Sequence, residues 1–215
     1  MKRRTAEDPW QRVISELKER RSIPFDKGLS DAEINGTEYR FGFRFPPDLR
    51  AFLQVGLPRG PQFPDWRSGD EARLWEWLDQ PRQGLLFDIQ YNGFWLTAWG
   101  ERPSKLAEAF GIANELIAKA PKLIPIFIHR MMPDEPRKAG NPVFSVHQTD
   151  IIHYGHDLLH YLNEEFTVAK WWTPPSEPRR IRFWDLERFQ EVRWKDGSCV
   201  FDNSRGILPE SSSES

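Results

Sequence analysis

The sequence predicts a single α+β domain in which helices flank an antiparallel β-sheet. Strand patterns gather between residues 123 and 154, whereas most helix patterns follow one another in runs. This order argues against repeating βαβ units. A chain of 215 residues is long enough to bury one substantial core. We expect the domain to span residues 9–207, with a flexible N-terminus at 1–8 and a disordered tail at 208–215, which offers almost nothing to bury.

Signals that start and stop helices are clearest in the N-terminal half. Asp8 and Pro9 provide an N-cap and a proline at the first helical position. Ser30 and Glu33 form the S-x-x-E capping box of a second helix, which Gly42 is expected to end. Further helices are predicted at about residues 47–55, 74–78, 106–120 and 156–166, and residues 57–69 are predicted to form a loop.

Strand signals follow in the second half of the chain. Residues 123–129 are rich in β-branched and aromatic side chains, which favours a strand. Residues 143–147 and 151–154 flank a short polar segment, as in a β-hairpin. The apolar stretch at 85–89 is ambiguous, because it is too short for periodicity to separate a buried strand from a helix turn.

Charge and composition limit the classes of binding partner and the cellular compartment that we expect. The formal net charge of -2 gives no basic field that would attract nucleic acid or an anionic membrane. No segment approaches the roughly 18 apolar residues of a membrane span. Cys199 is the single cysteine, so no internal disulfide is possible, as suits a reducing compartment. We therefore expect a cytoplasmic protein without nucleic-acid or membrane partners, in which Cys199 is packed near the start of a short strand.

Three segments carry a pattern of capped helices, glycine stops and aromatic strands. The first covers 29–34 and 41–53, where a Phe-Pro corner precedes a helix that contains an aromatic-Leu pair. The second lies within 84–100, and the third within 124–155. Together, in this order, they resemble the SUKH superfamily, which contains fungal cell-wall assembly regulators and bacterial immunity proteins that neutralise toxins.

The resemblance covers about residues 25–165 and leaves 166–207 as a C-terminal extension. It implies a SUKH-like fold, with helices around an antiparallel sheet, and a role in binding another protein. That partner would be a toxin domain if the chain is an immunity protein, and another cellular protein if it is an intracellular scaffold or regulator. The resemblance implies no catalytic residues, and we expect no cofactor.

A zinc-dependent hydrolase is the enzymatic alternative. His156 and His160 are spaced as in the H-E-x-x-H helix of zinc proteases, with an aspartate after the first histidine. Both lie away from the apolar stripe of the predicted helix, so we expect them to face solvent. A catalytic zinc ion needs a cleft, and exposed histidines are therefore the favoured interpretation. His129 with Arg130, near a strand end, is expected to be a hydrogen-bonded structural pair.

Tryptophans supply the candidates for partner binding. The chain has ten of them, and large aromatic rings anchor both cores and interfaces. Trp66 and Trp99 stand beside polar or turn residues outside a clear apolar periodicity, which predicts exposed rings. We therefore expect Trp66, Trp99, the neighbouring Asp65 and Trp95 to contact the partner. The oligomeric state is left open.

Overall fold

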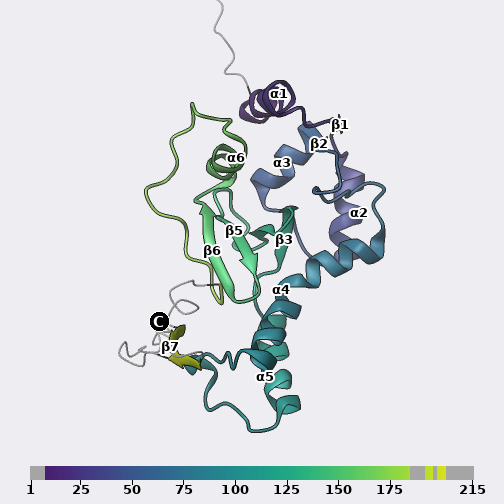
Figure 1. The fold of residues 1–215 in the computed structure, drawn as a ribbon. Coiled ribbons are helices and arrows are strands. Elements are labelled where there is room, and N and C mark those ends of the chain that lie inside the picture. The colour runs from purple at the N-terminus through teal and green to yellow at the C-terminus, as the bar shows by residue number, and fades with distance from the viewer. Residues whose placement is uncertain (1–7, 185–191, 196–197, 202–215) are drawn as a thin grey trace, which may run out of the picture.

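The computed structural model describes residues 8–184, 192–195 and 198–201. Its helices are α1 (Pro9–Arg21), α2 (Asp31–Phe41), α3 (Pro47–Val55), α4 (Glu71–Tyr91), the short 3-10 helix η1 (Thr97–Trp99), α5 (Leu106–Ala118) and α6 (Leu158–Phe166). Its strands are β1 (Phe25–Lys27), β2 (Gly56–Pro58), β3 (Leu123–Phe127), β4 (Arg130–Pro133), β5 (Val143–His147), β6 (Asp150–Gly155), β7 (Val192–Lys195) and β8 (Ser198–Phe201). The prediction of an α+β fold with an antiparallel sheet is confirmed (Figure 1).

The central sheet is an antiparallel meander in the order β3-β4-β5-β6. The predicted hairpin is present: β5 and β6 are joined at Gln148, which adopts a left-handed φ of 56°. Sequence patterns missed β4, and they also missed β1, which pairs with β2 in a separate two-stranded sheet. The predicted loop at 57–69 was therefore partly wrong, because its first two residues belong to β2. The region around Cys199 forms β8, whereas the cysteine side chain lies outside what the structure describes.

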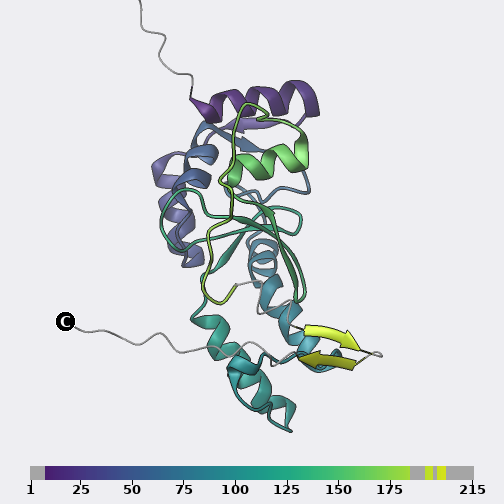
Figure 2. The same cartoon turned by 90° about the vertical axis from the view of Figure 1, so that its left-hand side faces the viewer.

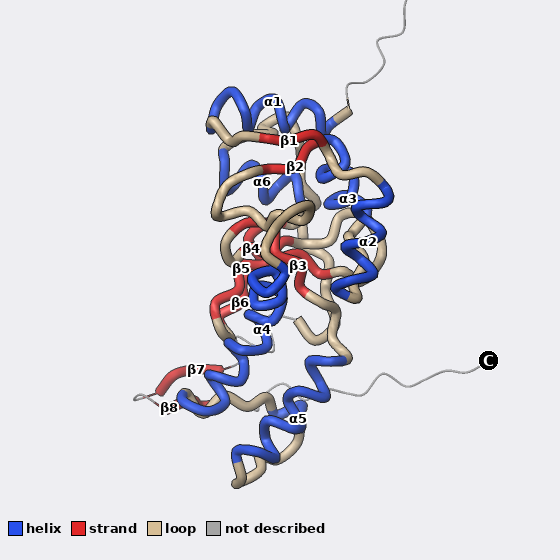
Figure 3. Tube along the Cα trace, turned by 90° about the vertical axis from the view of Figure 1, so that its right-hand side faces the viewer, coloured by secondary structure: helices blue, strands red, loops and turns tan. Residues whose placement is uncertain are grey.

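The sheet separates two hydrophobic clusters. Val143 points into the first cluster and the next residue, Phe144, into the second, as expected for alternate faces of a strand. Helices α1, α2, α3 and α6 contribute to the first cluster, while α5 and the second half of α4 contribute to the other. The molecule is accordingly elongated, with α1 near one end and α5 near the other (Figures 2 and 3).

Helix α4 connects the two clusters and resolves the ambiguous stretch at 85–89. Leu74, near its start, is buried in the first cluster, whereas Leu85 and Ile89 are buried in the second. Positions four apart lie on one helix face, so these two side chains reach the same core. The stretch is therefore helical, and α4 continues to Tyr91 despite Pro81 in its interior.

The start of α6 differs from the prediction. The helix begins at Leu158 and not at His156, because the Asp157 side chain is the N-cap and accepts a hydrogen bond from the backbone N–H of His160 at 2.8 Å. The expectations for residues 1–7 and 208–215 lie outside the described residues. Across the ranges that the structure does describe, no helix has the length and apolar character needed to cross a membrane.

Candidate functional site

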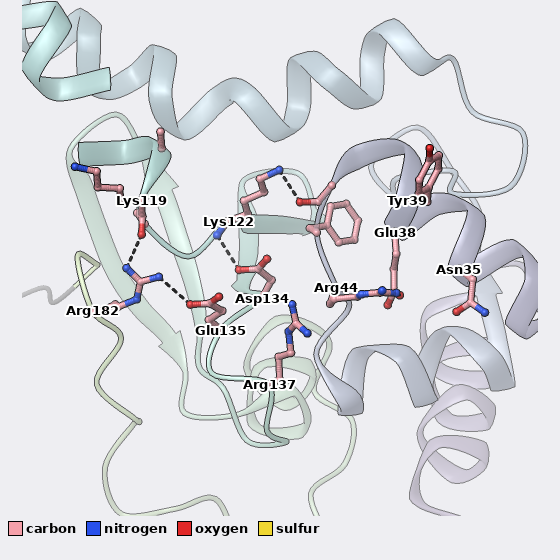
Figure 4. Close-up of a pocket in the computed structure, with 14 residues that line it drawn as sticks. Asn35, Glu38, Tyr39, Arg44, Lys119, Lys122, Asp134, Glu135, Arg137 and Arg182 are labelled. Atoms are coloured by element: carbon pink, nitrogen blue, oxygen red, sulfur yellow. Dashed lines mark hydrogen bonds and ion pairs between the residues drawn. The ribbon is translucent and has the colours of Figure 1, made fainter. Parts of the chain in front are cut away.

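A broad, open pocket lies between the C-terminal end of α2, the connection from α5 to β3 and the loop that follows β4 (Figure 4). Its volume is about 800 Å³. We call it the cationic pocket, and its walls are formed by Asn35, Glu38, Tyr39, Gly42, Phe43, Arg44, Ala118, Lys119, Ala120, Lys122, Asp134, Glu135, Arg137 and Arg182. Five of these side chains are Lys or Arg and three are Asp or Glu, so positive charge is in excess.

Lys122 holds two walls of the cationic pocket together. Helix α2 ends where Gly42 adopts a left-handed φ of 65°, a conformation that glycine reaches without strain. The Lys122 ammonium donates to the carbonyl oxygens of Gly42 at 2.7 Å and Phe41 at 3.2 Å. Its backbone N–H donates to Asp134 at 2.8 Å. Burial raises the pKa of the Asp134 carboxyl, although that hydrogen bond opposes the change.

The remaining carboxylates of the pocket already have cationic partners. Glu38 is buried, accepts the backbone N–H of Phe45 at 3.0 Å and forms ion pairs with Arg44 and Arg50. Glu135 pairs with Arg182 at 2.8 Å. In contrast, the Lys119 ammonium and the Arg137 guanidinium form no hydrogen bond or ion pair with any residue that the structure describes, and it is the backbone carbonyl of Lys119 that accepts from Arg182. These two cations are therefore available to an incoming anion.

An apolar groove adjoins the cationic pocket and shares Ala118 and Lys122 with it. Its volume is about 200 Å³, and we call it the Trp75 groove. It is lined by Phe41, Trp75, Leu78, Asp79, Pro81, Arg82, Ile117, Ala118, Pro121, Lys122, Leu123 and Trp184. Trp75 is 44% exposed and lies edge-on to Phe41, with their ring centroids 5.0 Å apart. The groove thus presents to solvent an aromatic ring that is held in place by its contact with Phe41.

Trp66 does not occupy the exposed position that its sequence context predicted. Only 6% of the residue is exposed, and its ring packs against Phe41, Phe43 and Phe45 with centroids 5.4–6.0 Å apart. The prediction of an exposed ring was based on the polar residues around Trp66. These residues form a turn, and the turn directs the ring into the core. Asp65 belongs to that turn: it accepts the backbone N–H of Ser68 at 3.1 Å and pairs with Arg59.

Trp95 and Trp99 belong to the second cluster, whereas Trp66 belongs to the first. Trp95 is 4% exposed, and its indole N–H donates to the Gly100 carbonyl at 2.8 Å. Trp99 is half-buried, and its ring contacts those of Phe94, Trp95 and Phe183. The expectation of a freely exposed Trp99 was therefore wrong. Trp66 lies in the first cluster, so these three tryptophans do not form one surface.

His156 and His160 are adjacent but only partly exposed, in contrast to the predicted solvent-facing pair. Their ring centroids are 4.8 Å apart. His160 Nδ1 accepts the backbone N–H of His156 at 3.0 Å, and His156 Nδ1 lies 2.8 Å from the Pro175 carbonyl oxygen. Both Nδ1 atoms are thus engaged within the fold. Among the described residues, no three His, Cys, Asp or Glu side chains are grouped as a metal site.

His129 and Arg130 form part of a hydrogen-bonded cluster on the sheet. Arg130 pairs with Glu165 at 2.9 Å, donates to the Ser145 hydroxyl at 2.6 Å and lies 3.7 Å from the centroid of the Tyr154 ring. Burial, together with the neighbouring Arg130 charge, lowers the pKa of His129. These contacts tie α6 to β4, β5 and β6, as expected for a structural pair.

Comparisons with known proteins found no relative of this chain. No family model, curated protein or solved structure matches this chain. The resemblance to the SUKH superfamily stays a prediction from sequence. The cationic pocket and the Trp75 groove are therefore the features that bear on function, and their residues come from five segments between 35 and 184. No local motif joins these residues, which is why sequence patterns did not identify them.

Proposed function

We propose that this chain is a non-catalytic protein-binding module of the SUKH type. The observation that carries the proposal is the open cationic pocket with a half-exposed tryptophan in the groove beside it. Interface hot spots are enriched in Trp and Arg, and their energy comes largely from removing such side chains from water. The pocket is open and has both polar and apolar walls, which suits a polypeptide that inserts several side chains.

The proposed partner is a toxin domain, for which the chain would act as an immunity protein. The segments within 84–100 and 124–155 resemble a bacterial branch of the SUKH superfamily, which supports this role; the alternative is an intracellular scaffold without a toxin partner. The two roles differ in a measurable way. An immunity protein must bind its toxin and restore growth, whereas a scaffold binds a partner that is not toxic.

The test uses the protein products of the genes that flank the gene for this chain. Each product is expressed with and without the full-length chain, growth is recorded, and binding of the purified proteins is measured by titration calorimetry. Immunity predicts one product that stops growth alone, is harmless beside this chain and forms a complex with it. A complex with a harmless product would favour a scaffold. The absence of a complex with every flanking product would contradict the immunity proposal.

Metal analysis of the purified chain tests the hydrolase alternative independently. The protein is expressed with zinc in the medium, and its metal content is measured by mass spectrometry. One zinc per chain that disappears in the His156→Ala/His160→Ala variant would favour the hydrolase. The protein-binding proposal predicts the same zinc content in the variant and the wild type.

A further inference from the structure

The cationic pocket and the Trp75 groove are two parts of one surface. Ala118 and Lys122 line both, so an extended segment can pass from one to the other without leaving the protein. Phe41 supports Trp75 in the groove, and its carbonyl accepts from the Lys122 ammonium. The apolar and the charged part are therefore held by the same residues at the end of α2.

The charges of this surface favour an anionic occupant. Arg44 and Arg182 each have a carboxylate partner. The Lys122 ammonium donates to carbonyl oxygens, which leave its full charge in place. With Lys119 and Arg137, this makes three cations that form no ion pair with a described carboxylate, although the charges of Lys122 and Arg137 act on the nearby Asp134. Carboxylates that enter the pocket would form charge-assisted hydrogen bonds, which are stronger than hydrogen bonds between neutral groups.

The Trp75 groove favours an apolar side chain beside those anionic groups. Phe41, Pro81 and Ile117 form its walls, and Trp75 is exposed along 44% of its surface. A leucine or phenylalanine side chain inserted there would remove this ring from water, which is the usual contribution of an interface anchor. A free phosphate or another small anion would leave the groove empty.

The same features argue against nucleic acid as the occupant. Glu38, Asp134 and Glu135 lie among the cations and would repel a continuous line of phosphates. The whole chain has a formal net charge of -2, which provides no long-range attraction for a polyanion. Separate carboxylate side chains can instead be spaced to meet the cations and to avoid the acids.

We infer that the cationic pocket and the Trp75 groove together form a docking site for an acidic segment of a partner protein, which places a bulky apolar side chain in the groove and carboxylates in the pocket. This inference depends on the proposed protein-binding function and specifies the chemistry of the partner. It also assigns roles to residues outside the predicted set of partner contacts: Lys119, Lys122 and Arg137 as anion contacts, and Trp75 as the aromatic anchor site.

The experiment selects a random 12-residue peptide library, displayed on phage, against the immobilised full-length chain. A Lys119→Glu/Arg137→Glu variant is added in solution and in excess. It captures phage whose peptides bind other surfaces of the protein, so these are washed away. We expect the surviving peptides to contain an excess of Asp and Glu and at least one bulky apolar residue. A labelled synthetic copy of one peptide should then bind at least about tenfold more weakly to the Trp75→Ala variant, as is typical for loss of an interface anchor.

A charge-matched control separates this site from a general effect of net charge. Arg20→Glu/Lys170→Glu makes the same change of charge at two exposed positions outside both pockets, and it should bind the peptide as the wild type does. Thermal midpoints of all variants verify that they are folded. Peptide affinity should fall as salt increases, because the carboxylates pair with exposed cations.

Three outcomes of the peptide experiment would overturn the inference. In the first, the selected peptides contain no excess of Asp and Glu. In the second, the labelled peptide binds the two pocket variants, Lys119→Glu/Arg137→Glu and Trp75→Ala, as tightly as it binds the wild type. The third is a single-stranded DNA oligonucleotide that competes as effectively as the peptide, since it would indicate an unselective anion site. If a flanking-gene product binds and the two pocket variants leave that binding intact, the docking site is wrong while the protein-binding function stands.

Discussion

The neighbours of Trp66 determine what its substitution should do. The ring is 6% exposed and is surrounded by three phenylalanines, so Trp66→Ala leaves a large cavity. We expect the free energy of unfolding to fall by about 3–5 kcal/mol, measured by urea titration. Trp75→Ala is the matched control, because Trp75 is 44% exposed, and it should cost about 1 kcal/mol or less. Equal losses for the two variants would contradict this assignment of core and surface.

Glu33 links the second helix to Arg67 and makes stability depend on pH. The hydrogen bond from Arg67, together with those from Ser30, lowers the pKa of Glu33 from 4.5 to about 2. A pKa that is lower in the folded state stabilises the protein above about pH 4.5, and this contribution is lost as pH falls towards 2. Glu33→Gln should therefore reduce the drop in thermal midpoint across this acidic range. Glu115→Gln, on the exposed side of α5, should leave the drop as in the wild type.

Local sequence predicts a residue's role well when its partners are near in the chain. Ser30 and Glu33 form the predicted capping box, with the Glu33 backbone N–H donating to the Ser30 hydroxyl at 3.3 Å and the Ser30 backbone N–H donating to the Glu33 carboxylate at 2.8 Å. The burial of Trp66 could not be predicted in the same way. The turn around Asp65 looks exposed in sequence, and only the packing of Phe41 and Phe45 shows that the ring points inward.

At the scale of elements, helices with clear caps were predicted and short strands were not. The boundaries of α2 follow from Ser30 and Gly42, which act through contacts within one turn of the helix. Strands β1 and β4 have only three and four residues and depend on partners elsewhere in the chain. Propensity carries little information over so few residues.

The packing of α4 on the central hairpin gives a test at this scale. A Cβ added at Gly84 would lie 2.7 Å from the Cα of Gln148, a backbone atom at the turn between β5 and β6. Gly84→Ala should therefore push the helix from the hairpin and lower the urea midpoint. Gly111→Ala is the control within another helix, where the described residues place no atom outside the local helix backbone within 4 Å of the new Cβ.

Gly111→Ala should change the free energy of unfolding in the opposite direction, because alanine restricts the unfolded chain and favours the helix. We expect Gly111→Ala to raise the free energy of unfolding by about 0.5–1 kcal/mol. Two variants with the same change of residue would thus move stability in opposite directions. Stabilisation by Gly84→Ala would show that α4 and the hairpin can separate without loss, contrary to the packing described above.

At the scale of the whole molecule, the candidate site joins residues that are distant in sequence. Trp75, Lys122 and Arg137 lie on α4, next to β3 and in the loop after β4. The α+β class could be predicted, because patterns of period 2 and 3.6 survive within single segments. The site could not, since its shape and charge arise only when α2, α4 and α5 are placed around the sheet.

The two hydrophobic clusters should unfold together, although the sheet separates them. Neighbouring residues Val143 and Phe144 belong to different clusters, and α4 contributes to both. Leu53→Ala in the first cluster and Leu85→Ala in the second remove side chains that are 3% and 1% exposed, so each should cost about 2–5 kcal/mol. Hydrogen exchange measured by mass spectrometry should show lower protection of both α3 and α5 in each variant, as in a two-state protein. Loss of protection on one side alone would mean that α4 and the sheet do not couple the clusters.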